Sequence, residues 1–239
     1  MLIGLWAVPR STSTAFERMC IERGDLEVRH EPFSRCWYLG PDARHPRYQP
    51  EQPDPEHAYE PVRDSLLAAA EGPRPVFFKD MAYHVLPWHE PAFMAHVRSS
   101  FLIRHPRLVL ASMARKMPDF TLAETGFPAL ESLFHLERER RGLVPPLLDS
   151  DALCSDPAGQ IAAWCEAMEL PFLPRALDWE PGLLPQWRVW EAWHQDVART
   201  SGFAPPRAPD TAEVPIEHAA ALDACMDIYH RLLPWKLES

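Results

Sequence analysis

Glycine, cysteine and basic residues are all scarce in this sequence. None of the 9 glycines belongs to a G-x-x-x-x-G-K-[ST] loop, which argues against a nucleoside triphosphatase of the usual kind. The 5 cysteines form no C-x-x-C pair, so we expect neither a zinc cluster nor a disulfide framework, but free buried thiols in a reducing compartment. Lysine and arginine number 24 against 34 acidic residues, and this net charge of -10 is atypical of a nucleic-acid-binding protein.

Long apolar runs are also missing. No uncharged stretch approaches the roughly 18 residues that a membrane-spanning helix requires. The apolar opening, residues 1–9, has neither the basic start nor the cleavage site of a secretory signal. We therefore expect a cytoplasmic protein with no membrane partner and no nucleic-acid partner.

Proline, by contrast, is abundant, with 27 residues concentrated in 41–61, 171–185 and 205–215. Proline lacks a backbone donor and restricts the residue before it, so these stretches predict ordered but irregular coil. The length and the 46 % of hydrophobic residues suit one core. We predict a single domain over residues 1–239, with a proline-rich insert at about 36–61 and a helical closing segment at about 186–239.

The pattern of apolar residues predicts alternating strands and helices. The expected strands are residues 2–8, 26–30, 75–79, 100–104 and 144–148. The expected helices are residues 15–23, 57–71, 106–116, 156–169, 186–200 and 212–233. This alternation predicts an α/β fold with three layers, a mainly parallel sheet and a P-loop-type strand–loop–helix start. Ligands of such sheets bind at the carboxyl ends of the strands.

One basic residue and four hydroxyl residues separate the first strand from the first helix. They are Arg10, Ser11, Thr12, Ser13 and Thr14. The free N–H groups and the dipole of a helix N-terminus favour an anion there, and the arginine adds a permanent charge. A simple helix cap is the alternative, but one hydroxyl would suffice for that. The stretch therefore predicts a phosphate or sulfate site.

A second basic motif follows the fourth expected strand. Arg104 lies at the end of that strand, and Ser112 lies about two helical turns into the next helix. Alone, the pair does not define a site, because a basic residue and a serine often share a surface.

Together, the two motifs resemble those of P-loop sulfotransferases. Residues 6–14, WAVPRSTST, resemble the 5′-phosphosulfate loop of that family, although Arg10 stands where many members have lysine. Residues 102–112, LIRHPRLVLAS, resemble its 3′-phosphate motif. Residues 76–84 and 147–157 are similar to segments of a bacterial branch of the family. The resemblance runs in order from the first strand to about Leu170.

The resemblance implies a donor, 3′-phosphoadenosine 5′-phosphosulfate (PAPS). Residues 10–14 would hold the 5′-phosphosulfate, whereas Arg104 and Ser112 would hold the 3′-phosphate. Residues 199–203 could lie over the nucleotide, although a helix cap at Gly202 is the plainer alternative. No metal is expected, because a sulfuryl group carries less charge than a phosphoryl group.

Three residues near the expected strand ends are candidate catalysts. Glu31 follows the second strand on a Glu-Pro turn that several branches of the family use for their general base, although an N-cap or a surface ion pair is an equally simple role. Lys79 would end the third strand and neutralise charge on the bridging oxygen. His84 is the alternative base, although a single histidine is more often structural.

The function predicted is sulfuryl transfer from PAPS to a hydroxyl or amine of a small organic acceptor. The aromatic and apolar segments 36–61 and 117–134 are the expected acceptor walls, and bacterial secondary metabolism is a plausible setting. A P-loop kinase-like phosphotransferase is the main alternative, although the lysine of its phosphate loop is missing. The second alternative is a non-catalytic nucleotide-binding protein with the same fold.

Overall fold

The computed structural model describes residues 1–48 and 50–238, so Gln49, within the predicted insert, and Ser239 at the end of the closing segment lie outside the described residues. The strands are β1 (Leu2–Ala7), β2 (Glu27–His30), β3 (Val76–Met81), β4 (Val97–Ile103) and β5 (Leu147–Asp149). The α-helices are α1 (Ser13–Arg23), α2 (Pro32–Tyr38), α3 (Tyr59–Ala70), α4 (Ala82–Val85), α5 (Pro91–Met94), α6 (Pro106–Ala114), α7 (Phe127–Arg141), α8 (Ser150–Ser155), α9 (Pro157–Ala167), α10 (Glu191–His194) and α11 (Ala219–Leu232).

Within these residues the strands form one parallel sheet in the order β2-β3-β1-β4-β5. The central strand, β1, is buried along its whole length, as its uninterrupted apolar sequence predicts. Its alternate side chains enter two separate cores: Leu2 and Trp6 pack on one face, and Ile3 and Leu5 pack on the other. The sheet is therefore covered on both faces.

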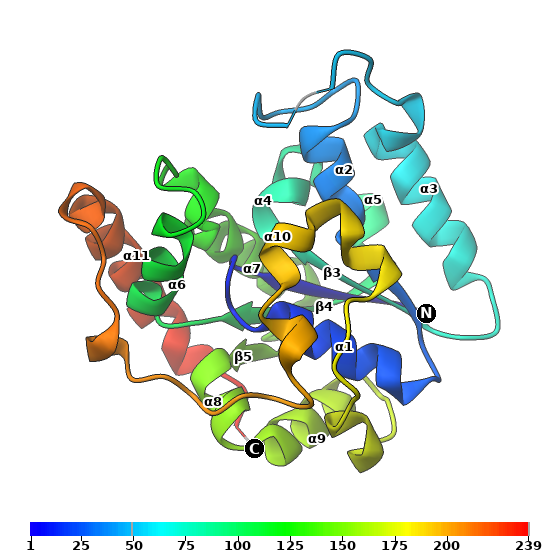
Figure 1. The fold of residues 1–239 in the computed structure, drawn as a ribbon. Coiled ribbons are helices and arrows are strands. Elements are labelled where there is room, and N and C mark those ends of the chain that lie inside the picture. Colours follow the sequence, from blue (N-terminus) through cyan, green and yellow to red (C-terminus); the bar gives the residue numbers. More distant parts are fainter. Residues whose placement is uncertain (49, 239) are drawn as a thin grey trace.

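Helices lie on both sides of this sheet (Figure 1). One core contains side chains of α1 and α9, where Phe16 meets Trp164 edge to face at 4.8 Å. The other core contains side chains of α2, α3, α5, α6, α7 and α11. This confirms the predicted three-layer α/β fold, and the sheet is entirely parallel rather than mainly so.

The connections place a crevice at the carboxyl edge of the sheet. The strands β1 and β4 are neighbours, but the chain turns to opposite faces after them, into α1 after β1 and into α6 after β4. Such a switch point leaves a gap between the two loops, which is where ligands of open parallel sheets bind. Both predicted anion motifs lie at this crevice.

Some predicted elements were wrong or incomplete. The fifth strand begins at Leu147 rather than at 144, because Pro145 and Pro146 have no N–H to donate to the sheet. Residues 186–200 form no continuous helix but a 3₁₀ turn (Pro185–Trp190), the short α10 and another 3₁₀ turn (Val197–Arg199). The last helix begins at Ala219 rather than at 212.

The longest helix, α7, was not predicted. Its first residue follows Gly126, whose φ of 77° lies in the left-handed region. A Cβ at this position would lie 2.9 Å from Pro9, so the glycine also allows the start of α7 to pack against the loop after β1. The helix thereby supports one wall of the crevice.

Candidate functional site

The loop after β1 has the geometry of an anion site. Arg10 (φ 58°) and Thr12 (φ 72°) both adopt the left-handed conformation, which costs about 1–2 kcal/mol for each non-glycine residue. The side chain of Thr12 makes no capping hydrogen bond to α1, and its hydroxyl bonds that of Ser150 instead at 2.5 Å. The simple helix-cap alternative therefore does not hold for Thr12. Alternating backbone conformations of this kind direct successive N–H groups into one concavity, as in anion-binding nests.

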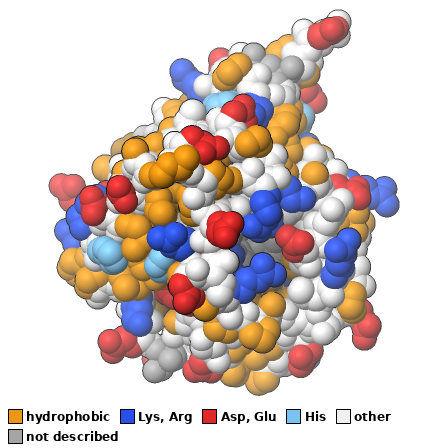
Figure 2. All heavy atoms as spheres, turned by 60° about the vertical axis from the view of Figure 1, so that its left-hand side comes forward, with side chains coloured by type: hydrophobic (Ala, Val, Ile, Leu, Met, Phe, Trp, Pro, Cys, Tyr) orange, Lys and Arg blue, Asp and Glu red, His pale blue; other side chains and the backbone are white. Residues whose placement is uncertain are grey.

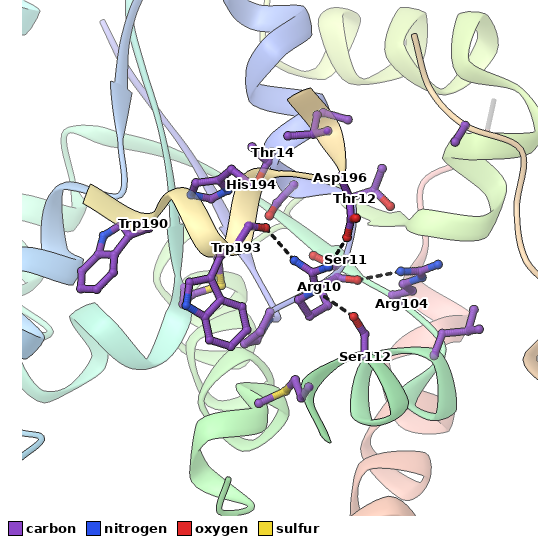
Figure 3. A pocket seen from close by; sticks show the side chains of 18 of the residues that line it. Arg10, Ser11, Thr12, Thr14, Arg104, Ser112, Trp190, Trp193, His194 and Asp196 are labelled. Atoms are coloured by element: carbon purple, nitrogen blue, oxygen red, sulfur yellow. Dashed lines mark hydrogen bonds and ion pairs between the residues drawn. The ribbon is translucent and has the colours of Figure 1, made fainter. Parts of the chain in front are cut away.

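Arg10 connects the loop to the second motif and to the C-terminal segment (Figure 3). Its Nε donates to Ser112 Oγ at 2.9 Å, so the two predicted motifs meet in space. Its Nη1 donates to the carbonyl of Trp193 at 2.8 Å, and its Nη2 donates to Asp196 at 2.8 Å. Because Asp196 is largely exposed, with 77 % of its side chain accessible, this contact is weak and an incoming anion can replace it.

Arg104 supplies a second cation beside the Arg10 backbone. Its Nη1 donates to the Arg10 carbonyl at 2.9 Å, whereas its Nε is buried without a partner. Burial lowers the pKa of Arg104, and the charges of Arg207 and Arg10 lower it further, although the guanidinium remains protonated. Arg104 is half-buried, and a cation in such a place is less favourable without a counter-ion. Arg104 is therefore prepared for an anionic ligand.

These groups line a cavity of about 500 Å³. Figure 2 shows basic side chains gathered around a recess on this face of the molecule. Five arginines line the cavity, namely Arg10, Arg104, Arg115, Arg199 and Arg207. A local cluster of positive charge thus lies in a protein whose overall charge is -10. The contributions of Arg115 and Arg207 were not predicted, because no strand end or motif marks them.

Glu31 and Lys79 form a buried ion pair in the wall of the cavity. The backbone brings them together, since Glu31 N donates to the Lys79 carbonyl at 2.9 Å. Burial alone raises the pKa of Glu31, but the Lys79 ammonium holds that pKa well below its ordinary value. The carboxylate makes no capping hydrogen bond to α2. Glu31 is therefore a charged partner of Lys79 rather than an N-cap.

His84 lines the same cavity with one ring nitrogen free. Its Nδ1 lies 2.6 Å from Asp80 Oδ1, and its buried Nε2 has no partner. The buried Asp80 also accepts hydrogen bonds from the N–H groups of Phe33 at 2.6 Å and Met81 at 2.8 Å, so it does more than cap a helix. A carboxylate only accepts hydrogen bonds, so Asp80 places a proton on Nδ1 and leaves Nε2 unprotonated and without a partner in the wall of the cavity.

A further buried network was not predicted from the sequence. The carboxylate of Glu17 accepts from Trp187 Nε1 at 2.9 Å and lies 2.7 Å from His30 Nδ1. Burial raises the pKa of Glu17, but His30 reverses this effect and leaves the pKa lowered. His194, on α10, lies beside His30, and burial together with the Lys79 charge lowers its pKa to about 3. His194 is therefore a neutral imidazole.

Aromatic side chains form the opposite part of the cavity. Tyr38, Tyr48 and Trp190 pack edge to face with ring centres 5.4–5.6 Å apart, and Tyr83 lies beside His84. All of them line the cavity, together with residues from both segments predicted as acceptor walls, namely Tyr38, Tyr48, Met117 and Glu124. The cavity thus has a basic part and an aromatic part, with the Glu31–Lys79 pair and His84 among its walls.

The fold and the cavity define an α/β protein with a cluster of arginines and buried acid–base groups at the carboxyl edge of its parallel sheet. The sequence model of the sulfotransferase domain matches residues 1–233. The chain therefore belongs to the sulfotransferase-domain family, in agreement with the resemblance in its two anion motifs.

Solved structures agree with this fold. The chain is similar to the sulfotransferase domain from the curacin biosynthetic pathway, with a TM-score of 0.54 and 14 % identity over 99 % of this chain and 98 % of that one. It is also similar to the sulfotransferase domain from the Synechococcus PCC 7002 olefin synthase, with a TM-score of 0.55 and 16 % identity over 96 % and 94 % of the two chains. At these identities the likeness shows the fold alone.

Two curated relatives come from Arabidopsis thaliana. They are branched-chain-amino-acid aminotransferase-like proteins 2 and 1, each 26 % identical over 233 residues. The match covers 97 % of this chain but only 41 % of each relative, so the chain spans about two fifths of their length. None of the helices within residues 1–48 and 50–238 is both long and apolar enough to cross a membrane. The cytoplasmic location and the single-domain organisation stay predictions.

Proposed function

We propose that this protein transfers the sulfuryl group of PAPS to a hydroxyl or amine of a small organic acceptor. The observation that carries this proposal is the meeting of the two anion motifs, in which Arg10 bonds Ser112 and Arg104 bonds the Arg10 backbone. A nucleotide with two anionic groups requires two neighbouring anion sites, and the two motifs provide them. Membership of the sulfotransferase-domain family supports the same conclusion.

Each of the two motifs binds a different part of the donor. The loop of residues 10–14 and the N-terminus of α1 receive the 5′-phosphosulfate through backbone N–H groups and hydroxyls. Arg104 and Ser112 receive the 3′-phosphate, and the unpartnered Nε of Arg104 supplies one donor for it. Arg207, whose charge acts on Arg104, adds to the attraction of the same phosphate.

The reaction needs positioning, charge stabilisation and one proton acceptor. The acceptor oxygen or nitrogen forms a bond to sulfur while the bond from sulfur to the bridging phosphate oxygen breaks. 3′-Phosphoadenosine 5′-phosphate leaves with the electron pair, and Lys79 stabilises the charge on the bridging oxygen. The acceptor proton passes to a base in the cavity wall.

We assign that base to His84 and keep Glu31 as the alternative. The Nε2 of His84 is free, whereas one carboxylate oxygen of Glu31 is engaged by Lys79. A carboxylate with a lowered pKa is also a weaker base. On this assignment Glu31 positions Lys79. Aromatic residues around His84 favour a small organic acceptor over a long acidic polymer.

Labelled donor distinguishes this proposal from its two alternatives. Incubation of the protein with PAPS labelled in the sulfuryl group and a library of hydroxyl and amine compounds should produce labelled acceptor. Phosphoryl transfer from ATP instead would favour the kinase-like alternative. Nucleotide binding without labelling of any acceptor would favour a non-catalytic protein.

Chelator should not lower this activity. A sulfuryl group carries less charge than a phosphoryl group, and the arginines and Lys79 supply the positive charge that magnesium supplies to kinases. We therefore expect the rate in excess EDTA to equal or exceed the rate without it. A rate that vanishes in EDTA and returns only with magnesium would contradict the proposal.

A further inference from the structure

Two histidines and a glutamate from distant parts of the chain form a cluster beside the anion loop. His30 ends β2, Glu31 follows it, and His194 ends α10. Each offers a ligand atom within 4.8 Å of those of the other two. Glu31 and His194 line the cavity, whereas His30 supports them from behind. Neither histidine has a role in the sulfuryl transfer described above.

Each imidazole is held by one nitrogen and leaves the other without a partner. His30 Nδ1 lies 2.7 Å from a Glu17 carboxylate oxygen, and His194 Nδ1 lies 3.3 Å from the hydroxyl of Thr14. The Nε2 atoms of both histidines are buried and make no hydrogen bond. Only 5 % of the His30 side chain and 4 % of His194 are exposed, so both rings are largely shielded from bulk water.

This pattern is characteristic of metal ligands. A metal-bound histidine usually donates its second nitrogen to a carboxylate or another acceptor, which fixes the ring and increases the basicity of the free nitrogen. Nδ1 of His30 is paired with the Glu17 carboxylate in this way, and Nδ1 of His194 is paired with the hydroxyl of Thr14. Glu31 adds an oxygen, and its other oxygen stays on Lys79. The set of two imidazoles and one carboxylate matches catalytic zinc sites, which keep a fourth position open.

We propose that this cluster binds one Zn²⁺ through Nε2 of His30, Nε2 of His194 and a carboxylate oxygen of Glu31. Tetrahedral zinc with bonds of about 2.0–2.1 Å requires its ligand atoms to be roughly 3.3 Å apart, so the cluster must contract by at most about 1.5 Å. The movable part is α10, a single short turn between two 3₁₀ turns. The fourth position faces the cavity.

Zinc at this position inhibits sulfuryl transfer. It adds a dication beside the Glu31–Lys79 pair and fixes α10 across the loop that receives the phosphosulfate, where Arg10 already bonds the Trp193 carbonyl. This consequence rests on the proposed function, whereas the binding itself does not. The site is therefore inhibitory rather than catalytic, in keeping with the activity that we expect in excess chelator.

Direct metal binding tests the proposal without any acceptor. The full-length protein, freed of metal, is titrated with Zn²⁺ by calorimetry and with Co²⁺ by absorption spectroscopy. We expect one ion per chain and the visible bands of tetrahedral Co²⁺. His194→Ala and His30→Ala should each weaken zinc binding by about 100-fold, and Glu17→Gln by about 10-fold, in line with the effects of supporting residues in zinc enzymes.

His135→Ala is the matched control, because His135 is exposed on α7 and belongs to no cluster. It should bind zinc as the wild type does. Equal affinity in the wild type, His30→Ala and His194→Ala would overturn the proposal, as would octahedral Co²⁺ bands in the wild type. A protein that binds zinc as described but transfers no sulfuryl group would leave the metal site standing and refute the proposed function alone.

Discussion

Replacement of His84 by asparagine is expected to lower kcat by about 10²- to 10⁴-fold, the range for a lost general base. Asparagine keeps the approximate size and can still bond Asp80, so the cavity should retain its shape. It has no free nitrogen lone pair to accept the proton of the acceptor. Steady-state kinetics with labelled PAPS measure the change, and donor affinity should stay within a few-fold of the wild type.

Glu31→Gln is the matched comparison. If His84 is the base, Glu31→Gln should lower kcat much less than His84→Asn does, because it only loosens the contact with Lys79. The assignment reverses if Glu31→Gln abolishes turnover and His84→Asn remains near wild type. Full activity of both variants would indicate a phenol or amine acceptor that needs no strong base.

Lys79→Met is expected to destabilise the fold by about 3–5 kcal/mol, the usual cost of removing one partner of a buried ion pair. Only 1 % of the Lys79 side chain and 11 % of the Glu31 side chain are exposed, so the substitution leaves a carboxylate without its counter-charge and largely without water. Urea denaturation of the wild type and the variant gives the difference in the free energy of unfolding, provided that the two proteins have the same m-value.

The double variant Lys79→Met/Glu31→Gln tests the cause of this loss. Neutralisation of Glu31 removes the unpaired charge, so the double variant should be more stable than Lys79→Met alone by at least 1 kcal/mol, a coupling typical of contacting residues. The buried ion pair would be contradicted if Lys79→Met lost less than about 1 kcal/mol of stability. It would also be contradicted if the double variant were no more stable than Lys79→Met.

The sheet and the meeting of the two basic motifs were predictable from sequence because both depend on local patterns. A strand buried on both faces is apolar without interruption, and residues 2–7 have that pattern. In a parallel sheet the strand ends meet at one edge, so Arg10 and Arg104 were expected in the same region although they are 94 positions apart. Their placement needed no knowledge of the remaining chain.

The C-terminal part of the site was not predictable in the same way. His194, Asp196 and Arg207 reach the cavity from a segment that consists of short 3₁₀ turns, the short helix α10 and coil. Their positions depend on contacts with residues far away in the chain, such as the hydrogen bond from Trp187 to Glu17. The short 3₁₀ turns there replaced a predicted helix for the same reason, because tertiary contacts rather than local propensity hold the segment.

Calorimetric binding of 3′-phosphoadenosine 5′-phosphate and of AMP tests the central claim most directly, because it requires no acceptor. The two nucleotides share the adenosine and the 5′-phosphate, so the difference reports the 3′-phosphate alone. Loss of one charge-assisted hydrogen bond to Arg104 costs about 1.5–3 kcal/mol, or roughly 10- to 150-fold in affinity. We expect the wild type to bind 3′-phosphoadenosine 5′-phosphate at least about 10-fold more tightly than AMP. Arg104→Ala should lose most of this preference. Equal affinity of the wild type for both nucleotides would contradict the assignment of the cavity to PAPS.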